Sequence, residues 1–157
     1  MKTKRILIVE DDEFSRGVME KLLQNSGYEV ESCANGEVAI SILIEKYFDI
    51  LISDLHLPGM DGFKLIKQAK LNQPDIKTIL ISGFVNEETD ERAILEKING
   101  LFPKPIAWGK FIAFLDGLIS SKKVNTCLPS QETKKSKGKP IFQRIAFVFI
   151  FFFITLL

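Results

Sequence analysis

The residues with the clearest chemical potential are three carboxylates, one hydroxyl and one amine that stand at or just after the ends of short apolar runs. These are Glu10 and Asp11 after residues 5–9, Asp54 after 50–52, Ser82 after 77–81 and Lys104 after 100–102. The runs are too short for helices and are typical of strands buried on both faces. Because parallel strands end at one edge of a sheet, where open α/β sheets bind ligands, we expect these side chains to form one site.

Three carboxylates and one lysine at one edge would suit a hard cation and a phosphoryl group. Clustered carboxylates repel one another, and Mg²⁺ relieves this by taking one or two carboxylate oxygens while keeping several waters. Together with Lys104, the cation would leave the site ready for a phosphoryl group, and Ser82 would donate a hydroxyl bond to one of its oxygens. Asp54 would then act as an in-line nucleophile and form an acyl phosphate.

Each residue also has a structural interpretation. Asp12 stands where the first helix should begin, so we expect it to be a helix N-cap rather than a metal ligand. Taken alone, Asp54 is a loop-starting or capping aspartate, Ser82 a turn serine and Lys104 a surface lysine. Their coincidence at one edge favours the functional interpretation.

Five strand-like runs alternate with five helical runs, which predicts an α/β fold with a parallel sheet and helices on both faces. The expected strands cover residues 5–9, 28–32, 50–54, 77–81 and 100–102. Four helices carry apolar stripes: Phe14, Val18, Leu22 and Leu23; Val38, Ala39, Ile42 and Leu43; Phe63, Ile66 and Ala69; Phe111, Phe114, Leu115 and Leu118. The helix expected over residues 86–98 is strongly charged, and residues 108–121 form the last helix.

Charge is unevenly distributed along the 157 residues. Residues 1–121 carry 14 Lys and Arg against 19 Asp and Glu, a net −5, whereas residues 122–157 carry 7 against 1, a net +6. An acidic domain argues against direct nucleic-acid binding. Cys33 and Cys127 lack metal-ligand spacing and are expected to be free thiols, and the absence of a signal peptide favours the cytoplasm.

Four motifs occur in order: ILIVEDD (6–12), DILISDLHLPGMDG (49–62), ISG (81–83) and FPKPI (102–106). On these motifs, residues 4 to about 121 resemble a receiver (response regulator) domain of bacterial two-component signalling. The resemblance implies a flavodoxin-like, doubly wound sheet of five parallel strands in the order 2-1-3-4-5, with five helices.

The resemblance also implies roles for the site residues. Asp54 matches the phosphoacceptor, Ser82 matches the switch hydroxyl and Lys104 matches the phosphate-binding lysine. Asp11 matches the direct Mg²⁺ ligand, and Glu10 matches the acid that holds a metal-bound water. His56 matches the position whose backbone carbonyl binds the metal. The implied partners are a sensor histidine kinase or phosphotransfer protein and an unknown downstream protein. Such a domain is not an enzyme, because it promotes only its own phosphorylation and dephosphorylation.

Three positions depart from the family pattern or add to it. Leu101 stands where an aromatic switch residue is usual, with Phe102 one position along, so the route to an output face is in question. Pro103 should stiffen the connection to Lys104. Phe84, two residues after Ser82, is a candidate shield of the phosphoryl group against water.

The remaining residues form a polar, lysine-rich stretch (122–140), interpreted as a flexible linker, and an apolar segment (141–157). As a helix the apolar segment would span roughly 26 Å, marginal for a hydrocarbon core of about 30 Å. The preceding lysines favour a membrane segment that would anchor the domain to the inner membrane. A truncated membrane protein or an out-of-register end are the alternatives.

Two other functions compete with the phosphoacceptor hypothesis. In a phosphatase with Asp54 as nucleophile, the position two residues on commonly carries a carboxylate as general acid, but here it is His56. The other alternative is a membrane-tethered binding module with vestigial phosphorylation, which the departure at Leu101 keeps open.

Overall fold

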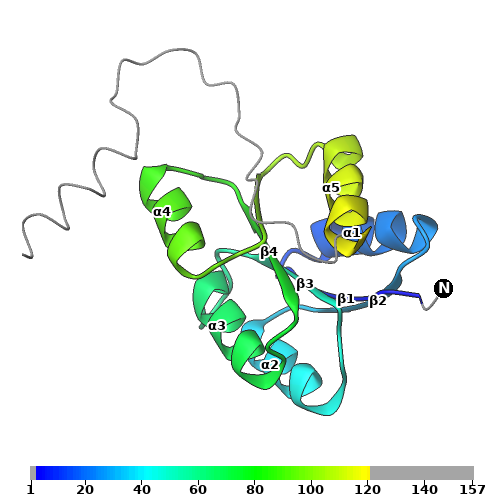
Figure 1. The fold of residues 1–157 in the computed structure, drawn as a ribbon, viewed down its shortest axis with the longest axis horizontal. Helices are drawn as coiled ribbons and strands as arrows, with labels where there is room; N and C mark the ends of the chain where they lie inside the picture. The colour runs from blue at the N-terminus through cyan, green and yellow to red at the C-terminus, as the bar shows by residue number, and fades with distance from the viewer. Residues whose placement is uncertain (1–2, 121–157) are drawn as a thin grey trace, which may run out of the picture.

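The computed structural model describes residues 3–120, which fold around one five-stranded parallel sheet in the order β2-β1-β3-β4-β5 (Figure 1). The strands are β1 (Arg5–Val9), β2 (Glu29–Cys33), β3 (Ile50–Asp54), β4 (Lys77–Ser82) and β5 (Gly100–Pro103). The helices are α1 (Glu13–Asn25), α2 (Gly36–Glu45), α3 (Gly62–Asn72), α4 (Glu87–Leu95) and α5 (Trp108–Ser120). The predicted flavodoxin-like, doubly wound fold is confirmed.

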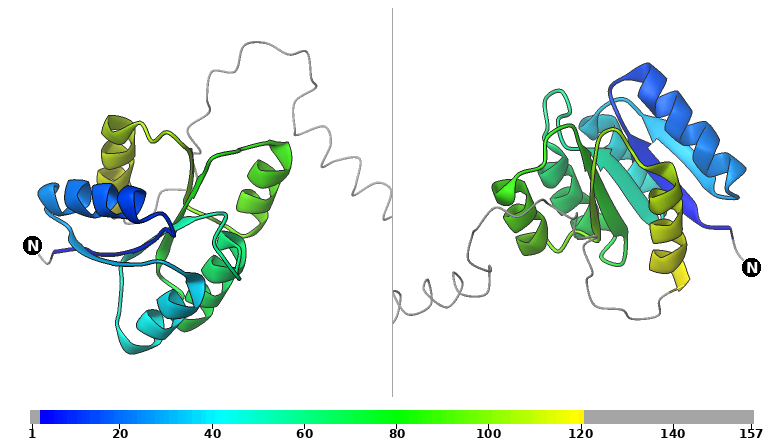
Figure 2. Two further views of the ribbon diagram at one scale, coloured as in Figure 1. Left: turned by 180° about the vertical axis from the view of Figure 1, so that it is seen from behind. Right: turned by 90° about the horizontal axis from the view of Figure 1, so that it is seen from above.

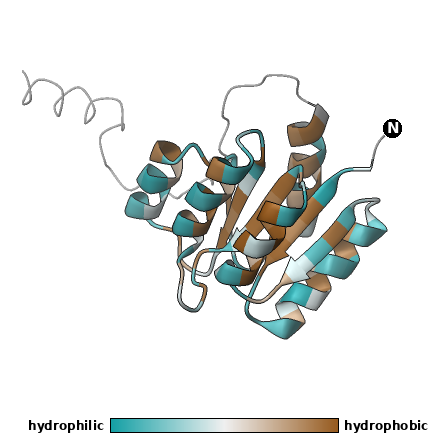
Figure 3. Cartoon of the chain, turned by 90° about the horizontal axis from the view of Figure 1, so that it is seen from below, coloured by the Kyte–Doolittle hydropathy of each residue, from teal (hydrophilic) through white to brown (hydrophobic). Residues whose placement is uncertain are grey.

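The sheet lies between two helical layers, with α1 and α5 on one face and α2, α3 and α4 on the other (Figures 1 and 2). Side chains of a strand alternate between the two faces, so Leu7 and Val9 join the core under α2, α3 and α4. Ile6 and Ile8 join the core under α1 and α5. The strands are accordingly the apolar centre of the molecule, and polar residues lie on the helices outside it (Figure 3).

Side-chain caps fix where four helices begin. The caps are Asp12, Asn35, Asp61 and Asn86, and each accepts a hydrogen bond from the backbone N–H three residues on. Such a bond satisfies one of the amide donors that have no partner inside the helix. The expected capping role of Asp12 is confirmed.

The buried faces of α1 and α2 agree only in part with those expected: Leu23, Ala39 and Leu43 are buried as expected, but two other residues of the stripes are exposed. Phe14 is 79% exposed and Val38 45% exposed, whereas Met19 is buried at 2%. At 100° per residue, Phe14 lies about 140° around α1 from Met19. A broad apolar arc does not specify which part of it meets the sheet, and the expected stripe was therefore wrong at Phe14 and Val38.

Helix α4 is shorter than the expected range of 86–98. It ends at Leu95, and Lys97 adopts a left-handed conformation with φ 52°. The ammonium of Lys70 in α3 donates to the carbonyls of Glu96 at 2.6 Å and Lys97 at 2.7 Å. These bonds satisfy carbonyls at the end of the helix and turn the chain toward β5.

Gln73, buried at the C-cap of α3, connects three elements. Its amide nitrogen donates to the carbonyls of Leu43 and Lys46, both at 2.7 Å, at the end of α2. Its amide oxygen accepts the N–H of Phe48 at 2.9 Å, just before β3. All hydrogen-bonding groups of the side chain except one lone pair are thereby used inside the protein.

The expected linker (122–140), the expected membrane segment (141–157) and Cys127 lie outside the described residues. Within residues 3–120, no helix is long and apolar enough to cross a membrane. Cys33 is a free, buried thiol, and burial raises its pKa to about 11.

Candidate functional site

The strand register brings the expected site residues to one edge of the sheet. Val9, the last residue of β1, pairs with Ser53, so Glu10 leaves the sheet beside Asp54. Asp54 pairs with Ile81 of β4, and Ser82 pairs with Pro103 of β5. The backbone N–H of Lys104 then donates to the carbonyl of Ser82 at 2.7 Å.

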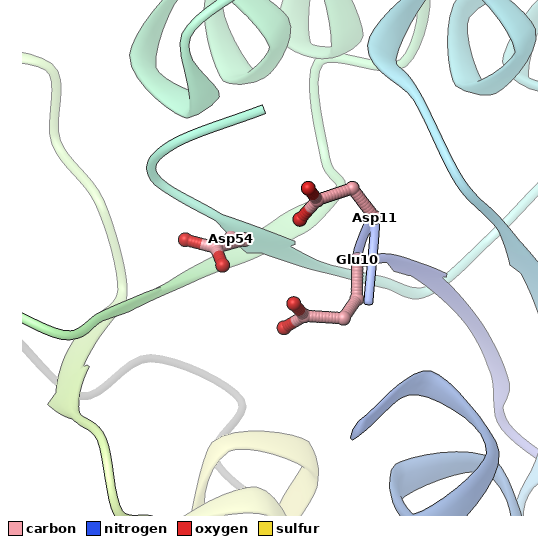
Figure 4. A group of neighbouring side chains, drawn as sticks. All are labelled: Glu10, Asp11 and Asp54. Atoms are coloured by element: carbon pink, nitrogen blue, oxygen red, sulfur yellow. The ribbon is translucent and has the colours of Figure 1, made fainter. Parts of the chain in front are cut away.

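Three carboxylates meet at this edge (Figure 4). Oxygens of Glu10, Asp11 and Asp54 all lie within 4.8 Å of one another. Glu10 is 1% and Asp54 7% exposed, whereas Asp11 is exposed to solvent. The three side chains thus form an acidic cluster that is closed on the sheet side and open at Asp11.

Lys104 binds two members of this cluster. Its Nζ lies 2.7 and 3.0 Å from the carboxylate oxygens of Glu10 and 2.5 Å from Oδ2 of Asp54. Burial raises the pKa of Glu10, and the neighbouring charge of Asp54 adds to this, although Lys104 opposes both. Burial alone would lower the pKa of Lys104, but its bonds to Asp54 and Glu10 outweigh this and raise it. Lys104 is therefore held as a cation between two buried carboxylates.

The backbone around Asp54 is fixed by short-range contacts. Oδ1 of Asp54 accepts the N–H of His56 at 3.0 Å, and the Ser53 hydroxyl donates to the Asp54 carbonyl at 2.7 Å. The chain then returns at Gly62, where an added Cβ would lie 2.4 Å from that carbonyl oxygen. A residue without a side chain is therefore required where α3 begins against Asp54.

Ser82 reaches the edge, but its hydroxyl is bonded within its own loop. The hydroxyl donates to the Phe84 carbonyl at 2.6 Å and accepts the Phe84 N–H at 3.1 Å. Ser82 is completely buried, whereas Phe84 is 69% exposed. A bond from Ser82 to a phosphoryl oxygen would require the hydroxyl to leave the Phe84 carbonyl.

Leu101 and Phe102 face opposite layers. Leu101 belongs to the core under α2, α3 and α4. Phe102 belongs to the other core and contacts Phe111 and Phe114 edge-on, with ring centroids 4.9 and 5.2 Å apart. The ring of Phe102 therefore does not take the place of the aromatic residue that is usual at the position of Leu101.

One residue that contacts the site backbone was missed in the sequence. Arg16 of α1 donates from Nη1 to the carbonyl of Glu10 at 2.8 Å and to that of Asp11 at 3.3 Å. An available signal was its place near the N-terminus of α1, where the helix dipole disfavours a cation unless an acidic group is near.

The donor set fits a hard divalent cation. Glu10, Asp11 and Asp54 offer only oxygens, which Mg²⁺ prefers, and the exposed side of Asp11 leaves room for the waters that Mg²⁺ retains. The expected contribution of the His56 backbone carbonyl remains a prediction. Because Lys104 now occupies oxygens of Glu10 and Asp54, a cation would share these carboxylates with it.

Residues 6–116 match the family model of the response regulator receiver domain. CpdR, a response regulator receiver protein of Brucella abortus, is 41% identical over 81 residues, covering 52% of this chain and 68% of CpdR. The DNA-binding transcriptional regulator NtrC of Salmonella typhimurium is 30% identical over 115 residues, covering 73% of this chain and 24% of NtrC. The sensor kinase CckA of Brucella abortus is 34% identical over 104 residues, covering 65% of this chain and 11% of CckA. The chain thus spans about a quarter or less of NtrC and CckA.

Solved structures agree with this match. A CheY-like receiver domain protein from Methanospirillum hungatei superposes with a TM-score of 0.72 at 25% identity, covering 75% of this chain and 94% of that one. The N-terminal domain of an uncharacterized protein from Wolinella succinogenes gives a TM-score of 0.68 at 29% identity, covering 74% and 94%. By sequence match and fold together, the chain belongs to the response regulator receiver domain family.

Proposed function

We propose that this protein is a phosphoacceptor response regulator that takes a phosphoryl group onto Asp54 in the presence of Mg²⁺. The observation that carries the proposal is the geometry around Asp54: one carboxylate oxygen faces Lys104 at 2.5 Å, and two further carboxylates lie within 4.8 Å. A nucleophile, a cation for the phosphoryl oxygens and a ligand set for Mg²⁺ are thereby adjacent.

In the proposed reaction, a carboxylate oxygen of Asp54 attacks the phosphorus of the donor. The bond between phosphorus and the donor nitrogen or oxygen breaks, its electron pair leaves with the donor, and an acyl phosphate remains on Asp54. Lys104 exchanges its bond to Asp54 for one to a phosphoryl oxygen, and the Ser82 hydroxyl leaves Phe84 for another. Asp11, Asp54 and the His56 backbone carbonyl, with Glu10 acting through a water, would hold Mg²⁺, which would supply positive charge against the negative charge of the transferring group.

The proposal extends to partners and place of action. The donor is a sensor histidine kinase or phosphotransfer protein, and similarity to both response regulators and a sensor kinase supports such a pathway. The domain acts in the cytoplasm, where the apolar residues 141–157 would tether it to the inner membrane. It promotes only its own phosphorylation and dephosphorylation rather than acting on a separate substrate, and it passes the signal to a downstream protein.

The test is intact-mass measurement after incubation with acetyl phosphate or phosphoramidate. The full chain should gain the mass of one phosphoryl group with Mg²⁺ and remain unchanged with excess chelator. Asp54→Asn, which keeps the side-chain shape, should gain nothing. An equal mass gain in Asp54→Asn would assign the phosphate to another residue and reject the proposal.

A further inference from the structure

Arg16 holds the backbone from which two of the three clustered carboxylates project. Its guanidinium donates to the carbonyl oxygens of Glu10 and Asp11 at 2.8 and 3.3 Å. The N–H of Glu10 donates to the carbonyl of Cys33, the last residue of the neighbouring strand β2, at 3.2 Å. Arg16 therefore binds the backbone of the two residues that follow β1, where the chain leaves the sheet.

The orientation of this turn decides where the carboxylates point. In an extended chain, consecutive side chains leave on opposite faces. The oxygens of Glu10 and Asp11 nevertheless come within 4.8 Å of each other and of Asp54 (Figure 4). The peptide groups between β1 and α1 must be turned for this convergence, and their carbonyls are the atoms that Arg16 binds.

Arg16 and Lys104 serve the cluster in different ways. Lys104 binds carboxylate oxygens of Glu10 and Asp54 directly, so a cation would have to share these carboxylates with it. The guanidinium, which stays charged at all physiological pH values, binds backbone carbonyls instead. It therefore brings a positive charge near the carboxylates while leaving their oxygens available.

We propose that Arg16 is a positioning residue of the divalent-cation site, acting through the carbonyls of Glu10 and Asp11. The inference rests on the proposed function for its biological meaning, but cation binding can be measured without a phosphodonor. Groups that orient metal ligands commonly contribute 10- to 100-fold to metal affinity. Arg16→Met, which keeps the apolar stem, should weaken Mg²⁺ binding by about 10- to 100-fold.

The experiment is a Mg²⁺ titration of the full chain by calorimetry, with a melting curve for each variant. Arg5→Met is the matched control, because Arg5 also donates to a carbonyl, that of Tyr47 at 2.7 Å, but at the opposite end of β1. Arg5→Met should lower the melting temperature and leave Mg²⁺ affinity within about twofold of wild type. Arg16→Lys keeps the charge and should restore part of the affinity, and it also decides the question if Arg16→Met does not fold.

Phosphate uptake at varied Mg²⁺ gives a second readout. In Arg16→Met the half-saturating Mg²⁺ concentration should rise while the rate at saturating Mg²⁺ stays close to wild type. Mg²⁺ affinity unchanged in Arg16→Met, or equally weakened in Arg5→Met, overturns the inference, as does a wild-type chain that binds no Mg²⁺. If the wild type binds Mg²⁺ but accepts no phosphate, the proposed function fails while the role of Arg16 stands.

Discussion

Among single residues, Gly62 is constrained by the lack of space for a side chain rather than by its backbone conformation. An added Cβ would lie 2.4 Å from the Asp54 carbonyl oxygen and 2.7 Å from a methyl of Leu80. Gly62→Ala should therefore destabilise the protein by about 1–3 kcal/mol in denaturant titrations, as overpacking does, and slow phosphate uptake at Asp54.

The control for Gly62 is Gly17→Ala in α1. A Cβ at Gly17 meets nothing within 4 Å, and alanine is favoured in a helix interior. Gly17→Ala should stabilise by about 0.5–1 kcal/mol and leave phosphate uptake unchanged. Equal losses in both variants would show that the contact with Asp54 is not the cause.

The sequence predicted which candidate site residues the strand ends bring together, and it missed the contacts that depend on side-chain conformation. Glu10, Asp54 and Lys104 follow directly from parallel strands that end at one edge. The bond of the Ser82 hydroxyl to the Phe84 carbonyl depends on one rotamer. The contact of Arg16 depends on a turn whose shape no spacing rule gives.

At the start of α1, the helix cap and the proposed metal ligand are neighbouring residues, and their roles can be tested separately. The Asp12 carboxylate accepts the Ser15 N–H at 2.7 Å, whereas Asp11 joins the acidic cluster. Asp12→Ala should lower the melting temperature and leave Mg²⁺ affinity unchanged. Asp11→Ala should do the reverse, and equal Mg²⁺ defects would show that the two positions are assigned in the wrong register.

The same cap gives a dependence on pH. The hydrogen bond from Ser15 lowers the pKa of Asp12 below its ordinary value. Its contribution to stability is therefore complete above the ordinary aspartate range and is lost as pH falls toward the lowered pKa. Between pH 5 and 3, the melting temperature of Asp12→Ala should fall less steeply than that of wild type.

The junction of α2, β3 and α3 depends on Gln73. Gln73→Met keeps the approximate volume but leaves the carbonyls of Leu43 and Lys46 and the N–H of Phe48 without this partner. Two of these groups, the Leu43 carbonyl and the Phe48 N–H, are buried, and each costs about 1–3 kcal/mol when left unsatisfied, so a total of at least about 2 kcal/mol is expected by denaturant titration. Gln68→Met, on the same helix but only half-buried, should cost far less.

Element type and order were predictable because alternation of short apolar runs with helical spacing leaves few topologies. Which face of a helix is buried and where a helix ends were not predictable. The buried face of α1 is chosen by packing of Met19 and Leu23 against the sheet. The end of α4 is set by Lys70, a residue of another helix, through carbonyls that no local pattern identifies.

For the whole molecule, we expect the full chain to fractionate with membranes and a shortened chain ending at Ser121 to remain soluble. Burying the apolar residues 141–157 would contribute about 25 cal/mol per Å², and each adjacent lysine about 1 kcal/mol at an anionic surface. The shortened chain should still accept phosphate, because the two cores under the helices use residues 6–119 alone. Carbonate extraction separates spanning from peripheral attachment. A full chain found wholly in the soluble fraction, or a shortened chain that does not fold, contradicts this assignment.

Helix α4 rests on the rest of the domain through very few side chains, and this has an evolutionary consequence. Of its nine residues Ala93 alone is buried, and Arg92 adds a contact over the ring of Phe63, 4.2 Å from the ring centroid. The other positions can diverge at little cost in stability, while the acidic cluster, built from strand ends, is unaffected. Descendants of such a domain could therefore change the exposed surface of α4 while keeping the same acidic cluster.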